Sequence, residues 1–251
     1  MPQKLGQHFL TNSGVLDRIA LAVCPEGEEL VIEIGPGKGA LTEKLLKRSG
    51  RVVAIEVDPL LVEYLGQKFE GETRLQVIHA DVLHTDLAQW GPVPIAGNLP
   101  YYITSPILEK SVRAGAPRTV FLIQKEVAHR LVAHPGERDY GYLTVQTALF
   151  ADTKLLFEVK PGAFKPPPKV DSAVVMLTPH GRDFGIADRE GFLKFLSHSF
   201  RQKRKTLRNN LFGVYGKELI DAWPEAGLRA EQIPMEKFAE MFRRVGDPGR
   251  A

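Results

Sequence analysis

The sequence has a single cysteine, Cys24, and no apolar run as long as a membrane-spanning helix. One thiol excludes an intrachain disulfide and any metal site built from several cysteines. A helix that crosses a bilayer needs about 20 consecutive, mostly apolar residues. The histidines show no spacing typical of metal ligands, and the first residues lack the apolar core of a signal peptide. These absences predict a cytoplasmic protein that uses neither a metal nor a membrane.

Strong compositional bias is also lacking. Hydrophobic residues make up 43% and charged residues 25% of the 251 residues, which is close to the average of soluble globular domains. This composition excludes a disordered chain, a collagen-like repeat and a small disulfide scaffold. The length suits one or two domains. No internal repeat is present, and nothing in the sequence indicates more than a monomer.

Short apolar runs alternate with helical patterns through the first two-thirds of the chain. The predicted strands are 30–34, 51–56, 75–79, 93–96 and 119–123, and the predicted helices include 40–47 and 59–69, the second capped by Asp58. This alternation predicts an α/β fold with right-handed βαβ units around a mostly parallel sheet. Such sheets bind ligands at the carboxyl ends of their strands. The candidate functional residues are therefore the polar ones at strand ends: Glu33, Glu56, Asp81 and Asn98.

The pattern changes in the last hundred residues. Segments 154–159 and 173–177 are typical of antiparallel strands joined by the proline-rich loop 164–169, and the chain beyond residue 180 is helical and basic. We therefore expect two domains, residues 1–180 and 181–251. Residues 182–251 hold 14 Lys and Arg against 10 Asp and Glu, and segment 194–208 has six bases and no acid. Such a segment is typical of a polyanion-binding surface, although a solvated helix face is the alternative.

A glycine-rich segment, 33–39, follows the first of these predicted strands and opens a helix. Glycines let a ligand approach the backbone, and a helix N-terminus offers free N–H groups. Glu56 ends the next strand, 21 residues after Gly35, where a carboxylate can accept hydrogen bonds from ribose hydroxyls. The pattern predicts an adenosine-containing cofactor. Gly35, Gly37 and Ala40 also fit a dinucleotide fingerprint, and a tight turn without any ligand is a further alternative.

Two acids favour S-adenosylmethionine over NAD as this cofactor. Asp81 and Val82 follow the third predicted strand, and the Asp81 carboxylate is placed to accept from an adenine amino group. Glu33 precedes the glycines, where its carboxylate can help to hold the methionine ammonium, directly or through water. The same charge would repel a pyrophosphate. A helix cap is the alternative role for Asp81.

The segment that begins at Asn98 is the candidate reaction site. The Asn98 side-chain carbonyl can accept one hydrogen of an exocyclic amine, and the Leu99 carbonyl, held by Pro100, can accept the other. Two acceptors make an adenine amine more nucleophilic, and an electrophilic methyl group then needs mainly to be placed in line. A base that leaves its stack needs aromatic faces. Tyr101 is one candidate face and Phe164 is the other. The alternative for these two aromatic residues is ordinary core packing, and the alternative for Asn98 is a structural role in the turn.

Several blocks of the sequence, in order along nearly the whole chain, resemble the KsgA/RsmA family of small-subunit ribosomal RNA adenine N6,N6-dimethyltransferases. The matching blocks are 6–10, 33–39, Glu56, Asp81, 98–101, 124–128, 164–172 and 200–207. The resemblance implies a Rossmann-like methyltransferase domain followed by a small helical domain, with S-adenosylmethionine as methyl donor. It also implies that the acceptors are two adjacent adenosines near the 3′ end of the 16S rRNA in the small ribosomal subunit.

The resemblance also implies roles for individual positions. By position, His8 and Leu10 line the cofactor site, Gly35 lies under the methionine part, Glu56 takes the ribose, Asp81 takes the adenine amine and Asn98 faces the methyl acceptor. Many family members have asparagine at the position of His8. The basic block supplies the predicted RNA-phosphate contacts, from Arg201, Lys203, Arg204, Lys205 and Arg208.

Other functions remain alternatives at this point. A methyltransferase that acts on large-subunit RNA would share the cofactor motifs and a similar aromatic turn. A DNA adenine methyltransferase would need a separate base-reading domain, and an NAD-dependent oxidoreductase would need an acid or base on the hydride side. A non-catalytic RNA-binding or assembly factor could also keep the cofactor fold. The intact segment 98–101 favours an active enzyme.

Overall fold

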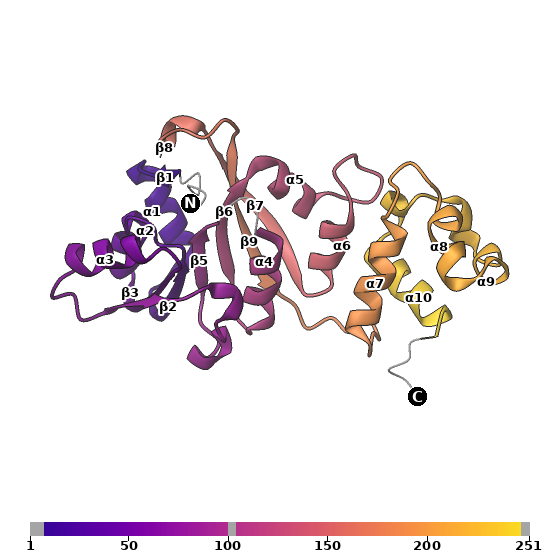
Figure 1. Cartoon of the computed structure of the whole chain (residues 1–251), viewed down its shortest axis with the longest axis horizontal. Helices are drawn as coiled ribbons and strands as arrows, with labels where there is room; N and C mark the ends of the chain where they lie inside the picture. Colours follow the sequence, from indigo (N-terminus) through magenta and orange to yellow (C-terminus); the bar gives the residue numbers. More distant parts are fainter. Residues whose placement is uncertain (1–7, 100–103, 247–251) are drawn as a thin grey trace. The chain divides into compact units, whose positions relative to one another are not determined.

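The computed structural model describes residues 8–99 and 104–246 (Figure 1). Contacts between Cα atoms divide the chain into two compact units, Met1–Ala128 with Ala151–Pro179, and His129–Phe150 with His180–Ala251. The sequence suggested a division into 1–180 and 181–251. The second unit does resume at His180, but residues 129–150 also belong to it. The first unit is therefore interrupted by a segment that completes the second.

The first unit contains a seven-stranded sheet in the order β4-β3-β2-β5-β6-β9-β7. Its strands are β2 (Glu28–Ile34), β3 (Ser49–Glu56), β4 (Leu75–His79), β5 (Ile95–Asn98), β6 (Thr119–Gln124), β7 (Ala151–Val159) and β9 (Ser172–Pro179). The first five pair in parallel, whereas β9 is antiparallel to both β6 and β7. The predicted parallel sheet and the predicted antiparallel pair are both confirmed.

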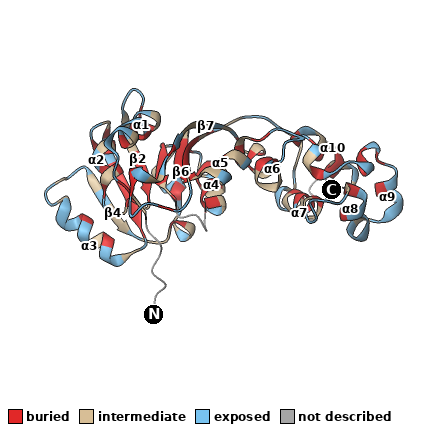
Figure 2. Ribbon diagram, turned by 90° about the horizontal axis from the view of Figure 1, so that it is seen from above, coloured by how far each residue is buried: buried red, intermediate tan, exposed pale blue. Residues whose placement is uncertain are grey.

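Helices cover this sheet on both faces, as the burial of successive strand residues shows (Figure 2). The helices that begin in this unit are α1 (Ser13–Val23), α2 (Ala40–Leu46), α3 (Pro59–Lys68), α4 (Thr104–Arg113) and α5 (Lys125–Val132). Val31 and Val52 pack with residues of α1 and α2 in one cluster, while the next residues, Ile32 and Val53, are equally buried. Since successive strand residues point to opposite faces, both faces are apolar.

The strand order reverses beside β2. The chain proceeds from β2 to β3 and β4 on one side, and then returns to β5 on the other side of β2. The carboxyl ends of β2 and β5 therefore form the switch point at which open α/β sheets bind ligands. Gly97 permits this pairing, because a Cβ atom there would lie 2.5 Å from the Ile34 carbonyl oxygen.

A second, two-stranded sheet joins segments that are far apart in the sequence. The strand β1 (Phe9–Leu10) pairs antiparallel with β8 (Phe164–Lys165). The sequence predicted residues 164–169 as a loop, so this short strand is an additional feature of that loop. The Thr11 N–H extends the connection by donating to the Ala163 carbonyl at 2.8 Å.

The second unit is helical, as the sequence predicts. Its helices are α6 (Tyr142–Ala148), α7 (Arg189–Ser199), α8 (Leu207–Tyr215), α9 (Lys217–Asp221) and α10 (Met235–Arg244). The core contains Phe192, Phe195 and Phe238 together with Tyr140 and Val145 from the inserted segment. The Tyr140 hydroxyl donates to the Ile233 carbonyl at 2.7 Å. No helix in the described part of the chain is long and apolar enough to cross a membrane.

Candidate active site

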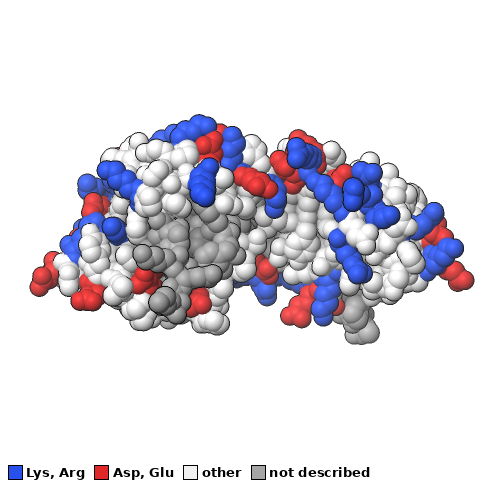
Figure 3. Space-filling model, turned by 45° about the horizontal axis from the view of Figure 1, so that its top comes forward, with Lys and Arg blue, Asp and Glu red and all other residues white. Residues whose placement is uncertain are grey.

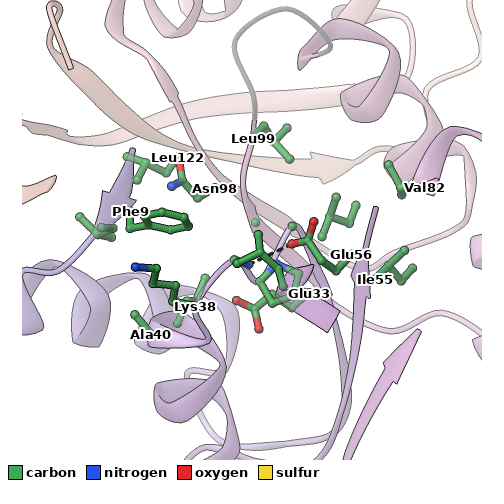
Figure 4. A pocket seen from close by; sticks show the side chains of 18 of the residues that line it. Phe9, Glu33, Lys38, Ala40, Ile55, Glu56, Val82, Asn98, Leu99 and Leu122 are labelled. Atoms are coloured by element: carbon green, nitrogen blue, oxygen red, sulfur yellow. Dashed lines mark hydrogen bonds between the residues drawn. The ribbon is translucent and has the colours of Figure 1, made fainter. Parts of the chain in front are cut away.

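A cavity of about 250 Å³ opens at the switch point of the sheet (Figure 4). Ten of the site residues predicted from the sequence line it: His8, Leu10, Glu33, Gly35, Gly37, Glu56, Asp81, Val82, Asn98 and Leu99. They come from β1 and the residue before it, from the ends of β2, β3 and β5, and from the segments that follow β2, β4 and β5. Residues about ninety positions apart thus meet at one place, at the carboxyl ends of the parallel strands.

The glycine-rich turn after β2 has the backbone that its sequence requires. Gly35 and Gly37 have φ angles of 65° and 57°, in the left-handed region that favours glycine. The Phe9 ring lies against this turn, since a Cβ atom on Gly37 would be 3.1 Å from the ring. The Lys38 ammonium lies 4.9 Å from the centre of the same ring, and Figure 4 shows the two side chains next to each other. Sequence reasoning assigned no role to Phe9 or Lys38; the only signal was their place within the matching blocks.

Backbone hydrogen bonds hold the Glu56 carboxylate at the end of β3. Its Oε1 accepts from the N–H groups of Val57 and Asp58, both at 3.0 Å, and its Oε2 accepts from the Gly37 N–H at 3.1 Å. A carboxylate has about four lone-pair sites, so these bonds orient Glu56 and leave capacity on Oε2. Glu56 therefore joins the glycine turn to β3 and can still receive a hydroxyl.

Glu33 is fully buried beneath the glycine turn. Its carboxylate accepts a hydrogen bond of 2.5 Å from the Thr42 hydroxyl. Burial is the main cause that raises the pKa of Glu33 to about 7, the Thr42 hydrogen bond opposes it, and the nearby Glu56 carboxylate raises it further. A cation placed in the cavity would favour the ionised form of Glu33. The site is therefore suited to a ligand that carries a positive charge close to β2.

We expect this buried carboxyl to make stability depend on pH. The pKa of Glu33 is raised from its ordinary 4.5 to about 7, so the free energy of unfolding falls as the pH rises from about 4.5 to about 7 and then levels off. In the wild type the free energy of unfolding should fall by about 3 kcal/mol over this range. In Glu33→Gln this fall should disappear. Denaturant unfolding without cofactor at pH 4.5–8 measures it. Glu29 is exposed on the same strand, so a Glu29→Gln profile that matched that of Glu33→Gln would contradict the assignment.

Asp81 follows β4 and is held by local contacts. Its Oδ1 accepts from the Leu83 N–H at 2.8 Å, and its Oδ2 lies 3.3 Å from His84 Nδ1. The first bond caps a short helical turn, which is the structural role that the sequence left open. The Asp81 side chain is 41% exposed and also lines the cavity. The capping bond therefore leaves oxygen capacity on the carboxylate for a ligand in the cavity.

The Asn98 side chain has a defined orientation at the cavity. Its Nδ2 donates to the His8 backbone carbonyl at 3.2 Å. A carbonyl oxygen can only accept, so the amide nitrogen faces His8 and Oδ1 is the atom left for a ligand. The neighbouring Leu99 is fixed through its own N–H, which donates to the Leu122 carbonyl at 3.0 Å. This orientation is compatible with the acceptor role that the sequence predicts for Asn98 Oδ1.

Of the remaining predicted reaction-site residues, Phe164 is not among the described residues that line the cavity. Pro100 and Tyr101 lie outside the residues that the structure describes. Phe164 was expected to stack on the base, but its side chain is 3% exposed and packs in the core of the first unit. Strand pairing causes this burial, because Phe164 is opposite Leu10 in the β1–β8 sheet. In this structure its position matches the core-packing alternative.

The charges around the cavity favour one of the two cofactors considered. Among its described lining residues, Glu33, Glu56 and Asp81 are acids and Lys38 is the one basic residue apart from His8. This balance suits a sulfonium and an ammonium and disfavours a pyrophosphate. The described lining residues therefore fit S-adenosylmethionine. The described residues contain no group of three side chains that could hold a metal ion.

The predicted basic segment joins α7 to α8 in the second unit. Arg201, Lys203, Arg204, Lys205 and Arg208 are all exposed, and Figure 3 shows Lys and Arg side chains gathered on one face of this unit. The Lys203 ammonium donates to the Arg138 carbonyl, and Arg208 pairs with Asp221 at 2.6 Å. Within the described residues no ion pair engages the other three. Several exposed cations are thus available to an anionic partner.

The buried residue Asn210 holds this basic segment in place. Its Nδ2 donates to the carbonyls of Ser199 and Gln202, at 2.8 and 3.3 Å. These bonds join α8 to the end of α7 and to the loop that carries the cations. The Asn210 amide therefore fixes the backbone of the segment from the buried side, and the charged side chains point to solvent.

Comparison with known proteins identifies the family. The model of the ribosomal RNA adenine dimethylase family matches residues 2–246. The chain belongs to this family. The resemblance drawn from the sequence blocks is therefore confirmed, and S-adenosylmethionine is the cofactor of this dimethylase.

Curated relatives cover nearly the whole dimethylase. A ribosomal RNA small subunit methyltransferase A from Acidobacterium capsulatum is 42% identical over 97% of this chain and 91% of its own length. A probable ribosomal RNA small subunit methyltransferase A from Methanosarcina acetivorans is 38% identical over 96% of this chain and 92% of its own length.

Two solved structures share the fold of the dimethylase. A dimethyladenosine transferase from Plasmodium falciparum superposes with a TM-score of 0.80 at 26% identity, covering 96% of this chain and 99% of its own. The 23S rRNA methyltransferase ErmE superposes with a TM-score of 0.71 at 25% identity, covering 94% and 99%. The predicted Rossmann-like methyltransferase fold is confirmed.

Proposed function

We propose that the protein transfers methyl groups from S-adenosylmethionine to N6 of two adjacent adenosines near the 3′ end of 16S rRNA. The products are N6,N6-dimethyladenosines, formed on the small ribosomal subunit during ribosome biogenesis. The observation that carries the proposal is the orientation of Asn98, whose Oδ1 is available at the cofactor cavity. The names of the curated relatives support the small subunit as the substrate particle. A cytoplasmic location and a monomeric state remain predictions from the sequence.

In this mechanism the chain positions the acceptor amine. In the first transfer to each adenosine, Asn98 Oδ1 accepts one N6 hydrogen and the Leu99 carbonyl accepts the other. In the second transfer, one of these two oxygens accepts the single N6 hydrogen that is left. Both contacts strengthen as the nitrogen gains positive charge in the transition state, which is where hydrogen bonds accelerate a reaction. S-adenosylmethionine, when bound, supplies the electrophilic methyl group. Because the alkylated nitrogen is strongly acidic, its proton can pass to water and no strong general base is needed.

The protein also orients the donor. Glu56 holds the ribose through the capacity left on Oε2. The Glu33 carboxylate, below the glycine turn, attracts the methionine ammonium. Asp81 receives the adenine amine with the oxygen capacity that its helix cap does not use. These contacts fix both ends of the donor, so that its methyl group is held in line with the amine.

The basic segment of the second unit provides RNA affinity in this proposal. Phosphate contacts by lysine and arginine position a nucleic acid without reading its sequence. The expected target is therefore a shape, namely a hairpin loop with unstacked adenosines presented by the assembled particle. Arg201, Arg204 and Lys205 are the cations proposed to make these contacts, with Lys203 and Arg208 beside them.

Neutralising two of these cations should weaken RNA binding and reduce its salt dependence. Each phosphate contact contributes about 0.9 to the slope of log K against log salt for a duplex and about 0.7 for a single strand. The variant Arg204→Gln with Lys205→Gln should therefore lower the slope by about 1.4 to 1.8. Binding of 16S rRNA fragments at several salt concentrations measures it.

The control removes the same charge elsewhere. Lys47 and Arg51 are exposed near the start of β3, at the end of the sheet away from the cavity. The variant Lys47→Gln with Arg51→Gln should leave the slope close to that of the wild type. An equal fall in both variants would mean that only the net charge matters and that segment 201–208 has no specific contact with phosphate.

A transfer assay tests the proposed function as a whole. Labelled S-adenosylmethionine is mixed with small subunits that lack the modification, and in parallel with large-subunit RNA and with duplex DNA. Label recovered as N6,N6-dimethyladenosine only in the small subunit is the expected result. No label in any substrate, with the cofactor still bound, would contradict the enzymatic proposal and favour an assembly factor.

The second candidate is methylation of large-subunit RNA. The structural similarity to the 23S rRNA methyltransferase ErmE supports it. Against it, relatives that are 38–43% identical are named for the small subunit. Label in large-subunit RNA would favour this candidate and contradict the proposed small-subunit substrate.

A further inference from the structure

Residues 8–12 and residues 163–166 are joined by a set of hydrogen bonds that we name the N-terminal clasp. It contains the β1–β8 pairing, in which Phe9 lies opposite Lys165. It also contains three bonds to the Ala163 carbonyl, from the N–H groups of Thr11 at 2.8 Å and Asn12 at 3.2 Å and from the Thr11 hydroxyl at 3.2 Å. The clasp fixes the chain that precedes α1 against the loop between β7 and β9.

His8 is the end of this clasp nearest to Asn98, and it makes hydrogen bonds in two directions. Its Nδ1 lies 2.8 Å from the Pro166 carbonyl oxygen. That oxygen can only accept, so Nδ1 carries a hydrogen and donates. The backbone carbonyl of His8 accepts from Asn98 Nδ2 at 3.2 Å. One residue thus connects the proline-rich loop to the amide at the acceptor site.

The second of these bonds determines which Asn98 atom faces the substrate. If the amide turned over, Oδ1 would meet the His8 carbonyl, and two acceptor oxygens would repel each other. The position of the His8 carbonyl therefore selects the orientation with Oδ1 toward the cavity. That carbonyl is held by β1 on one side and by the imidazole bond to Pro166 on the other.

We infer that His8 is a positioning residue for methyl transfer, acting through the orientation of Asn98. This role rests on the proposed function, which makes Asn98 Oδ1 the acceptor for the adenine amine. It differs from a role in lining the cofactor cavity, because it is transmitted by a backbone carbonyl and by an anchor on the proline-rich loop. The property that matters at position 8 is an N–H donor attached directly to the γ carbon.

A pair of isosteric variants separates this role from simple packing. In His8→Asn, Nδ2 occupies the place of the histidine Nδ1 and can donate to Pro166. In His8→Asp an acceptor-only oxygen occupies that place and meets the carbonyl. The two side chains have almost the same size. The added negative charge of Asp should also leave the affinity for a cationic cofactor equal or greater.

The expected result is a split between turnover and cofactor affinity. The kcat of His8→Asp on small subunits should be at least about tenfold below that of His8→Asn, since a misplaced acceptor loses part of its transition-state stabilisation. The Kd of S-adenosylmethionine should be no weaker in His8→Asp than in His8→Asn. Equal kcat values in the two variants, or a matching loss of cofactor affinity, would overturn the positioning role.

A second measurement follows the clasp without any turnover. Amide hydrogen exchange reports the Thr11 N–H, which donates to Ala163. Its exchange should be faster in His8→Asp than in His8→Asn, while amides in β3 exchange equally in both. Equal protection of Thr11 would overturn the anchor.

The two measurements distinguish the possible failures. If the wild type methylates no small subunit, the proposed function and the positioning role both fail, and the exchange rates still report whether the clasp exists. If the wild type is active and the two variants turn over equally, only the positioning role fails.

Discussion

In Asn98→Ala, kcat for methyl transfer should fall by about 10²–10³-fold, the range found when a single oriented transition-state hydrogen bond is removed. The reason is the loss of Oδ1, which the bond from Nδ2 to the His8 carbonyl keeps directed to the cavity. The contacts proposed for the ribose and the methionine come from other residues. The Kd of S-adenosylmethionine should therefore stay within a few-fold of the wild-type value, and calorimetry with a single-turnover assay measures both.

The variant Asn98→Asp is the matched comparison. It keeps the size of the side chain and an acceptor oxygen, but it replaces the donor that bonds to His8 with a second acceptor. Its kcat should also fall, because the carboxylate loses the contact that orients it. Wild-type turnover in Asn98→Ala would contradict the assignment of Asn98 to the methyl acceptor.

In Glu56→Gln, the affinity for S-adenosylmethionine should fall by about 100-fold. A hydrogen bond between a ribose hydroxyl and the capacity left on Oε2 is worth up to about 3 kcal/mol, and a neutral amide loses much of this. The amide also places an NH₂ group where backbone N–H groups donate, at Gly37 or at Val57 and Asp58. The glycine turn should loosen as a result. Calorimetric titration with S-adenosylmethionine measures the effect.

A neighbouring carboxylate controls for the change of charge. Glu63 is exposed on α3, and Glu63→Gln should bind the cofactor as the wild type does. At saturating cofactor, Glu56→Gln should recover most of its turnover, because its proposed contacts are made before the transition state as well as in it. An unchanged Kd would mean that the ribose is held elsewhere.

Much of the first unit could be predicted because its signals are local. Strand β4 has the predicted bounds 75–79, and Asp58 caps α3 by accepting from the Leu60 N–H at 2.9 Å. Strand β5 was predicted at 93–96 but spans Ile95–Asn98. Pro94 has no N–H to donate to a neighbouring strand, so the regular pairing begins after it. The strand ends then brought the predicted polar residues together.

The parts that could not be predicted depend on pairing between distant segments. The β1–β8 pairing joins residues about 155 positions apart, and two-residue strands leave no periodic pattern in a sequence. The burial of Phe164 follows from this pairing and not from its own neighbours in the loop. The grouping of residues 129–150 with the second unit is equally non-local, since their apolar residues find partners beyond residue 190.

The interruption of the first unit has a consequence for truncated forms of the protein. A fragment that stops at residue 180 would retain Tyr140 and Val145 but lose Phe192, Phe195 and Phe238, which belong to the same hydrophobic core. Exposed apolar side chains of this kind promote aggregation and attract proteases and chaperones. During synthesis, residues 129–150 cannot pack into their core until the last quarter of the chain has been made. A stable catalytic fragment therefore requires excision of residues 129–150 as well as removal of the tail.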